Sequence, residues 1–366
     1  MNWPVHGSNP QYLFKAMGLP LTQEYVDFSA NINPLGPPSI LKENWPHFYD
    51  KLMVYPDPNT VKLKTFISEK EKLPVESLLI GNGGSELIHL VSRWLTGKTV
   101  LIVQPTFSEY ESACRANQCE IRYFSLTGPE FKWEMNKFRE SLAGVDALFF
   151  CNPNNPTGIH YSQELVLEII KVCNEEQCVV ILDEAFYDFV VEYESMLPYI
   201  HHYPNLLILR SMTKMFSIPG LRLGYLTASE KMVRELLPLQ PHWSVNTVAL
   251  LAGEICLGDH DFILNTQEFI AMERNRLFDF FQHHRFRVTN STVNFYLLKD
   301  PTVKNQYEMF EFLVKNAIIP RHTFNFPGLE GNWLRFAIKS REENTKLMEV
   351  LARWRTSHPL YSSAVE

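Results

Sequence analysis

The stretch LLILRSMTKMFSIPGLRLGYLTA, residues 206–228, holds two short apolar runs on either side of a polar turn that contains a lysine. The flanking runs are apolar on both faces, which is typical of strands in a buried sheet. Comparable runs occur earlier in the chain at 78–80, 99–103, 146–151 and 178–183. The series predicts a buried and largely parallel sheet.

Amphipathic segments alternate with these strands. The segments at 85–95 and 162–173 each begin with a serine and have apolar residues three and four apart, so we expect right-handed crossover helices and an α/β core. From about residue 250 the pattern changes to a long helical stretch at 262–284, followed by strand candidates at 293–298 and 333–338, which indicates a smaller α+β domain.

The expected organisation has three parts. Residues 1–44 form an arm that joins the small domain, 45–245 the large domain and 246–366 the small one. The Pro-rich opening, up to residue 39, lacks helical periodicity and is expected to lie extended.

Composition excludes several classes of protein. The chain has 366 residues, 45% of them hydrophobic, and 34 basic against 41 acidic residues, so a disordered chain or a nucleic-acid partner is not expected. The N-terminus lacks the features of a signal peptide, and no run of 18 apolar residues occurs, which favours a soluble, cytoplasmic protein without a membrane partner. The six cysteines lack metal-ligand spacing, so we expect reduced thiols and no metal site.

Lys214 follows the strand at 206–210 and has hydroxyls and an arginine nearby. A lysine in this position is usually a solvated surface residue. The functional alternative is a lysine that forms a Schiff base beside an anionic cofactor, for which Ser211, Thr213 and Arg222 are candidate donors.

Three other strand ends carry polar motifs. GNGGSE at 81–86 is either a plain turn or a phosphate site at a helix start. Asp183 is the last residue of an apolar strand. It could cap a helix, form a salt bridge at the surface, or be a buried carboxylate with a cationic partner. NPNNPTG at 152–158 is compatible with turn chemistry alone.

The order of five motifs along the chain favours the cofactor-binding interpretation over turns and surface residues. PTF, NPNNPTG, DEAF, SMTK and GLRLGY, at 105–107, 152–158, 183–186, 211–214 and 220–225, resemble the motifs of pyridoxal-phosphate enzymes of the aspartate-aminotransferase superfamily, from about residue 27 to 350. The resemblance implies the type I fold of these enzymes. It also implies pyridoxal 5'-phosphate held covalently by Lys214, with Asp183 paired to the protonated pyridine nitrogen.

The same resemblance implies further roles. Phe107 would stack on the pyridine ring, and Asn155 would donate to its phenolic oxygen. The phosphate would be held by Gly84, Ser85, Ser211, Thr213 and Arg222. Tyr55 would reach that phosphate from a second subunit, which implies a homodimer, and Arg335 would bind the substrate α-carboxylate.

One position departs from the usual motif. Most aminotransferases of the superfamily read DEAY, whereas this chain has Phe186. We expect the adjacent Tyr187 to point to the other face and not to substitute for the missing hydroxyl.

The N-terminal motifs narrow the resemblance. HGSN at 6–9, VDFSANINPLGPP at 26–38 and IIPRHTFNFPGL at 318–329 resemble threonine-phosphate decarboxylases of cobalamin biosynthesis, with an amino-acid phosphate as substrate. The substrate would then be bound by His6, Asn9, Asn31 and Asn33, with Arg321 as a further anion-binding group. The alternative for the first four is a polar arm that only docks on the core. The alternative is a histidinol-phosphate aminotransferase or another class I/II aminotransferase, followed by a cofactor-binding regulator without turnover.

Overall fold

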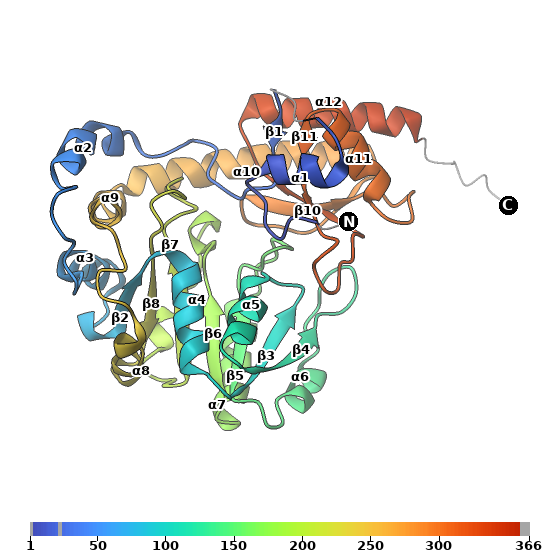
Figure 1. Cartoon of the computed structure of the whole chain (residues 1–366). Helices are drawn as coiled ribbons and strands as arrows, with labels where there is room; N and C mark the ends of the chain where they lie inside the picture. Colours follow the sequence, from blue (N-terminus) through green and yellow to red (C-terminus); the bar gives the residue numbers. More distant parts are fainter. Residues whose placement is uncertain (1–2, 21–23, 359–366) are drawn as a thin grey trace.

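The computed structural model describes residues 3–20 and 24–358 (Figure 1). Its centre is a seven-stranded sheet in the order β2-β8-β7-β6-β5-β3-β4, in which β8 runs opposite to the other six strands. The predicted largely parallel sheet is confirmed. Its strands are β2 (Leu78–Gly81), β3 (Thr99–Gln104), β4 (Glu120–Ser125), β5 (Ala147–Cys151), β6 (Val179–Asp183), β7 (Leu206–Ser211) and β8 (Gly224–Ala228).

Helices cover both faces of this sheet because its strands are apolar on both. Val100 and Ile102 pack under α4 (Gly83–Trp94), α5 (Glu109–Ala116) and α8 (Glu230–Leu236), and Leu101 and Val103 pack on the face of α6 (Met135–Ser141) and α7 (Gln163–Glu175). Ser162 caps α7 as predicted, with its hydroxyl accepting from Leu165 N. By contrast, α4 begins at Gly83, two residues before the expected Ser85.

A second, antiparallel sheet lies above the first (Figure 1) in the order β12-β13-β10-β9. Three helices pack on it, of which α10 confirms the long helix predicted at 262–284. The elements are β9 (Arg287–Val288), β10 (Phe295–Lys299), β12 (Arg321–His322), β13 (Leu334–Ala337), α10 (His260–His283), α11 (Tyr307–Lys315) and α12 (Arg341–Ser357).

The N-terminal segment joins this upper part, since β1 (Val26–Asp27) pairs in parallel with β11 (Ile318–Ile319). The pairing supports the proposed arm. However, the opening is not wholly extended: residues 10–17 form helix α1 (Pro10–Met17), which starts on a proline, buries Leu13 and Phe14, and ends at Gly18 in the left-handed region.

The remaining elements of the described chain are three further helices and four short 3-10 turns. Helix α9 (Thr247–Leu257) packs against α2 (Ser39–Asp50) and α3 (Val61–Glu71), at the left of Figure 1. Short 3-10 turns are η1 (Val75–Ser77), η2 (Tyr187–Phe189), η3 (Leu197–Tyr199) and η4 (Leu237–Leu239).

Candidate active site

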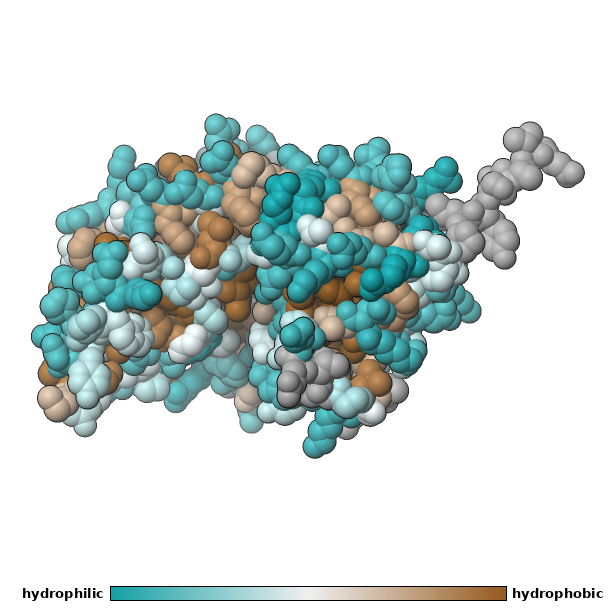
Figure 2. All heavy atoms as spheres, turned by 90° about the horizontal axis from the view of Figure 1, so that it is seen from above, coloured by the Kyte–Doolittle hydropathy of each residue, from teal (hydrophilic) through white to brown (hydrophobic). Residues whose placement is uncertain are grey.

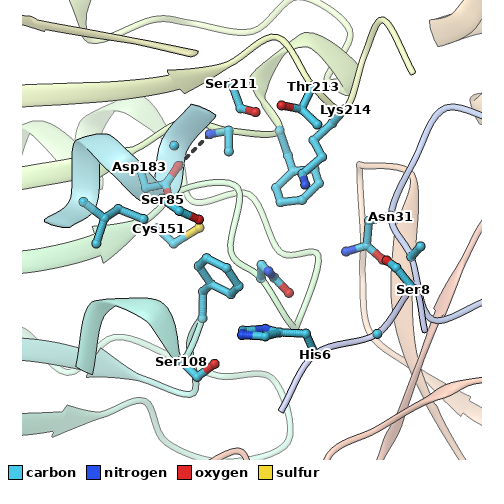
Figure 3. Close-up of a pocket in the computed structure, with 18 of the residues that line it drawn as sticks. His6, Ser8, Asn31, Ser85, Ser108, Cys151, Asp183, Ser211, Thr213 and Lys214 are labelled. Carbon is cyan, nitrogen blue, oxygen red and sulfur yellow. Dashed lines mark hydrogen bonds between the residues drawn. The ribbon is translucent and has the colours of Figure 1, made fainter. Parts of the chain in front are cut away.

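A pocket lies at the carboxyl ends of the parallel strands, where open α/β sheets bind their ligands. Figure 3 shows Lys214 and Thr213 on one side, Asp183 and Ser85 on another, and His6 and Asn31 entering from the arm. The structure brings together thirteen of the residues predicted from sequence: His6, Asn31, Gly84, Ser85, Phe107, Asn155, Asp183, Ser211, Thr213, Lys214, Arg222, Arg321 and Arg335.

Three predicted residues lie elsewhere. Asn33 is buried, and its amide donates to Met215 O and to Thr266 Oγ1, both at 2.8 Å, so the expectation that it faces the substrate is corrected. Asn9 lines a separate, smaller hollow. Tyr55 is 81% exposed and packs against Trp243 on the surface, with 5.4 Å between ring centroids.

Lys214 lies three residues beyond β7 and points into the pocket (Figure 3). Burial, and then the positive charges of Arg222 and Arg335, lower the pKa of Lys214 to about 8, while Asp183 opposes the shift. Near neutral pH the side chain therefore has an appreciable uncharged fraction, which is the form that attacks a carbonyl carbon.

Asp183 is the last residue of β6, and its carboxylate is held from two sides. Tyr110 Oη donates to Oδ2 at 2.6 Å, and the Ala185 N–H donates to Oδ1 at 2.9 Å. Burial raises the pKa of Asp183, and these two bonds counter the rise. Sequence reasoning missed Tyr110; the available signal was its place three residues after Phe107, at the start of a helix.

The start of α4 forms an anion cradle. Gly83 has a φ of +79°, and a Cβ there would lie 2.5 Å from Arg222 Nη2, so only glycine lets the guanidinium approach the helix start. The free N–H groups of the first turn, at Gly84 and Ser85, attract a negative charge. Ser211 lines the same end of the pocket.

Asn155 and Arg335 form a direct contact in the pocket. Arg335 Nη1 donates to Asn155 Oδ1 at 2.6 Å, and Nη2 donates to Ser29 O at 2.7 Å. Since the amide oxygen of Asn155 accepts from Arg335, its NH₂ group is the part left to donate to a ligand. Arg335 Nε is buried without a partner among the described residues.

Arg321 and Arg335 are paired residues on neighbouring antiparallel strands, β12 and β13. Both line the pocket, and they are only 3% and 7% exposed. Burial lowers the pKa of Arg335 to about 10, and burial together with the charge of Arg335 lowers the pKa of Arg321 to about 9. Within the described ranges neither forms an ion pair with a carboxylate.

The arm contributes His6 and Asn31. His6 Nε2 lies 2.9 Å from Glu109 Oε1 at the start of α5. Asn31 is buried, and its Oδ1 has no partner in the described structure. A buried polar atom without a partner at a pocket wall is a group available to a ligand.

Phe186 lines the pocket and packs edge-on against Phe295, with 4.7 Å between ring centroids. Tyr187 does not substitute for the missing hydroxyl, because its ring lies under the Arg210 guanidinium, 3.6 Å from ring centroid to Cζ, outside the pocket. The expectation that Tyr187 points away from the pocket is confirmed, although Tyr187 begins a 3-10 turn and does not lie in an extended strand. Sequence reasoning missed the buried Arg210–Glu184 ion pair beside it, at 2.8 Å.

These groups fit pyridoxal phosphate. The helix-start cradle with Arg222 suits its phosphate, Lys214 its aldehyde, Asp183 its pyridine nitrogen and Phe107 its ring face. The φ of Gly83 and the missing Cβ there are what such a phosphate site requires.

Comparison with known proteins defines the class. The pattern of the family described as aminotransferase class I and II matches residues 23–351. The chain belongs to this family of pyridoxal-phosphate-dependent enzymes, and it is an enzyme of this kind.

Three relatives illustrate the range of similarity. The threonine-phosphate decarboxylase of Salmonella typhimurium is 34% identical over 355 residues, which is 95% of each chain. A histidinol-phosphate aminotransferase of Bacillus velezensis is 28% identical over 338 residues, covering 90% of this chain and 91% of the relative. The crystal structure of the histidinol-phosphate aminotransferase of Clostridium acetobutylicum has a TM-score of 0.85 at 31% identity and covers 90% of this chain and 99% of that one.

Two further findings concern membrane-spanning helices and the cysteines. No helix within the described ranges is long and apolar enough to cross a membrane. The six cysteines are unpaired, and all but Cys119 are buried.

Proposed function

We propose that this enzyme decarboxylates O-phospho-threonine to give aminopropanol phosphate and carbon dioxide. The observation that carries the proposal is the cross-strand pair of Arg321 and Arg335 at the pocket wall. Like charges directly opposite each other on a sheet are destabilising, so two buried guanidiniums without carboxylate partners favour a ligand with two anionic groups. A phosphorylated amino acid carries both a carboxylate and a phosphate.

The proposed roles of the cofactor-binding residues follow from their positions. Gly84, Ser85, Ser211, Thr213 and Arg222 hold the phosphate of pyridoxal phosphate, Phe107 stacks on its ring, and Asn155 donates to its phenolic oxygen. When bound, the cofactor supplies an electron sink for the electron pair left at the substrate Cα. Asp183, held by Tyr110, keeps its charge against the pyridine nitrogen.

The substrate-binding residues surround the other end of the pocket. Arg335 binds the α-carboxylate, with its Nε group free to join the contact. Arg321, His6 and Asn31 bind the substrate phosphate. After the bond from Cα to the carboxylate breaks, the Lys214 ammonium returns a proton to Cα.

Histidinol-phosphate aminotransferase is the second candidate. It is supported by the solved structure with 31% identity and by a pocket that would serve both reactions. An aminotransferase aligns the Cα–H bond for cleavage where a decarboxylase aligns the bond to the carboxylate, and the orientation of the bound substrate decides between them.

We also propose that the chain forms a homodimer in which Tyr55 reaches the cofactor phosphate of the partner. Several large apolar side chains are exposed around α2 and the segment after it: Trp45, Tyr49, Leu52, Met53, Val54 and Tyr55. Figure 2 shows hydrophobic side chains among hydrophilic ones at the end of the molecule where α2 lies. A clustered apolar surface of this kind is typical of a protein interface.

The test is to incubate the holoenzyme with O-phospho-threonine and, separately, with histidinol phosphate plus 2-oxoglutarate, and to identify the products. Carbon dioxide from the first mixture supports the decarboxylase. Glutamate from the second mixture, with no carbon dioxide from the first, supports the aminotransferase.

A further inference from the structure

The arm segment 3–9 lies along the wall of the pocket. Val5, His6, Gly7 and Ser8 line the pocket, and Figure 3 shows His6 and Ser8 entering it from the arm. Val5, His6 and Ser8 are exposed, so they bury little apolar surface of their own. The arm therefore needs an anchor elsewhere if His6 is to keep a fixed position.

Trp3 supplies apolar contact for this segment. Its ring stacks on Phe324, with 4.8 Å between centroids, and lies 5.1 Å from His322. Phe310 and Tyr307 meet it edge-on at 5.8 Å and 6.2 Å. These four rings form an aromatic cage around Trp3, all of them from the C-terminal part of the chain.

Hydrogen bonds beside the cage hold the arm backbone. Arg321 Nη2 donates to Val5 O at 2.5 Å, and His322 Nε2 lies 3.0 Å from Pro4 O. Arg321 is also a pocket residue, so one guanidinium contacts both the arm and the site. At the far end of the segment, Ser8 N donates to Ser29 Oγ at 2.9 Å.

Tight packing leaves the arm little freedom between these bonds. A Cβ at Gly7 would lie 2.5 Å from Ser29 O, so the arm lies directly on the backbone there. The His6 contact with Glu109 then links the arm to α5 on the large sheet. His6 thus lies between a fixed anchor at Trp3 and a fixed contact at Ser8.

We propose that Trp3 is a positioning residue for substrate selection. By docking in the aromatic cage it holds His6 and the Arg321 guanidinium at the phosphate end of the pocket, and it touches neither substrate nor cofactor. The proposal rests on the proposed function, because it assigns the arm to the substrate phosphate.

The test compares Trp3→Ala with Tyr12→Ala, a control in which an exposed aromatic ring is removed from α1. We expect Trp3→Ala to raise KM for O-phospho-threonine roughly tenfold or more, in line with the loss of a charge-assisted contact, while kcat and the absorbance of bound cofactor change little. Tyr12→Ala should match the wild type. Trp3→Leu, which keeps apolar volume, should show a smaller rise and serves if Trp3→Ala does not fold.

Hydrogen exchange tests the anchoring of the arm by Trp3 independently of the proposed decarboxylase activity. Hydrogen exchange of the arm amides, including Ser8 N–H, should quicken in Trp3→Ala and remain unchanged in β10. If the arm exchanges as slowly as in the wild type, or if kcat falls with KM unchanged, the positioning role is wrong. If the arm loosens but the wild type does not act on O-phospho-threonine, the proposed function fails and the anchoring of the arm by Trp3 remains.

Discussion

Tyr110 Oη lies 2.6 Å from Asp183 Oδ2, and the tyrosine is fully buried between α5 and the large sheet. Burial and the neighbouring carboxylate hold the pKa of Tyr110 well above its ordinary value, so the phenol stays protonated and donates. This bond fixes one oxygen of the carboxylate that faces the pocket.

Tyr110→Phe should weaken catalysis without unfolding the protein. The substitution leaves a buried carboxylate oxygen without its donor, which costs about 1 to 3 kcal/mol, and the pKa of Asp183 should rise further. We expect a roughly tenfold or greater loss in kcat and a shifted absorbance of the bound cofactor. The control is Tyr161→Phe, which removes a buried hydroxyl that donates to Phe131 O at 2.7 Å outside the pocket. Equal loss of kcat in both variants would mean that the Asp183 contact has no special role.

Lys214→Met should stabilise the cofactor-free protein near pH 7. The folded-state pKa of Lys214 is lowered to about 8 from an ordinary value of 10.5, so the folded chain releases this proton before the unfolded chain does. The stability of the wild type therefore rises between about pH 8 and 10.5, and below pH 8 the buried charge is unfavourable. We expect Lys214→Met to be more stable by about 3 kcal/mol at pH 7 and the gap to close as pH approaches 10.5.

Denaturant unfolding of the cofactor-free proteins at several pH values measures this difference. Lys231→Met is the control, since it removes the ammonium group of an exposed lysine on α8, away from the pocket. A gap that stays constant with pH would contradict the lowered pKa.

Substitutions of the residues that bind the phosphate end and the carboxylate end of the substrate should have different effects on phosphorylated and unphosphorylated substrates. His6→Ala and Asn31→Ala should reduce kcat/KM for O-phospho-threonine about tenfold to a hundredfold while sparing any reaction of unphosphorylated threonine. Arg335→Ala should damage both reactions, because both substrates carry an α-carboxylate. Steady-state kinetics on the two substrates provide the comparison, and equal losses for both substrates in the His6 and Asn31 variants would exclude a phosphate-binding role.

Tyr55→Phe should weaken cofactor binding about tenfold if the hydroxyl reaches the partner's cofactor phosphate. Tyr49→Phe is the matched control, because Tyr49 is 73% exposed on α2 and belongs to the same apolar surface, but has no role assigned at the cofactor phosphate. Cofactor titration gives the affinity, and sedimentation gives the oligomeric state. A monomeric wild type, or equal affinities in the two variants, would argue against the shared site.

Sequence predicted the buried strands well because each is an apolar run with no polar face. It missed β4 (Glu120–Ser125), an edge strand in which only Phe124 is buried, since partly solvated strands lack that signature. It also missed α1, which is stabilised by burying Leu13 and Phe14 more than by its short sequence pattern.

Most residues of the candidate site could also be predicted from the sequence, but not all of their contacts. Motif residues such as Lys214 and Arg335 do line one pocket, because the carboxyl ends of the strands and β13 meet there. Asn33 belongs to a polar motif, but its buried amide bonds to Met215 and Thr266 could be known only once α10 was in place. For Tyr110 the only sequence signal was its place after Phe107, because its role depends on how α5 packs on the large sheet and brings the phenol to Asp183.

The most direct test of the proposed activity is the fate of the substrate α-carboxylate in heavy water. The holoenzyme is incubated with carboxyl-labelled O-phospho-threonine in D₂O, and gas and solution are analysed by mass spectrometry and NMR. Decarboxylation should give labelled carbon dioxide and aminopropanol phosphate with one deuteron on the former Cα, in equal amounts. Retention of the label in the amino acid, with exchange at Cα or with glutamate formed from histidinol phosphate and 2-oxoglutarate, would contradict it.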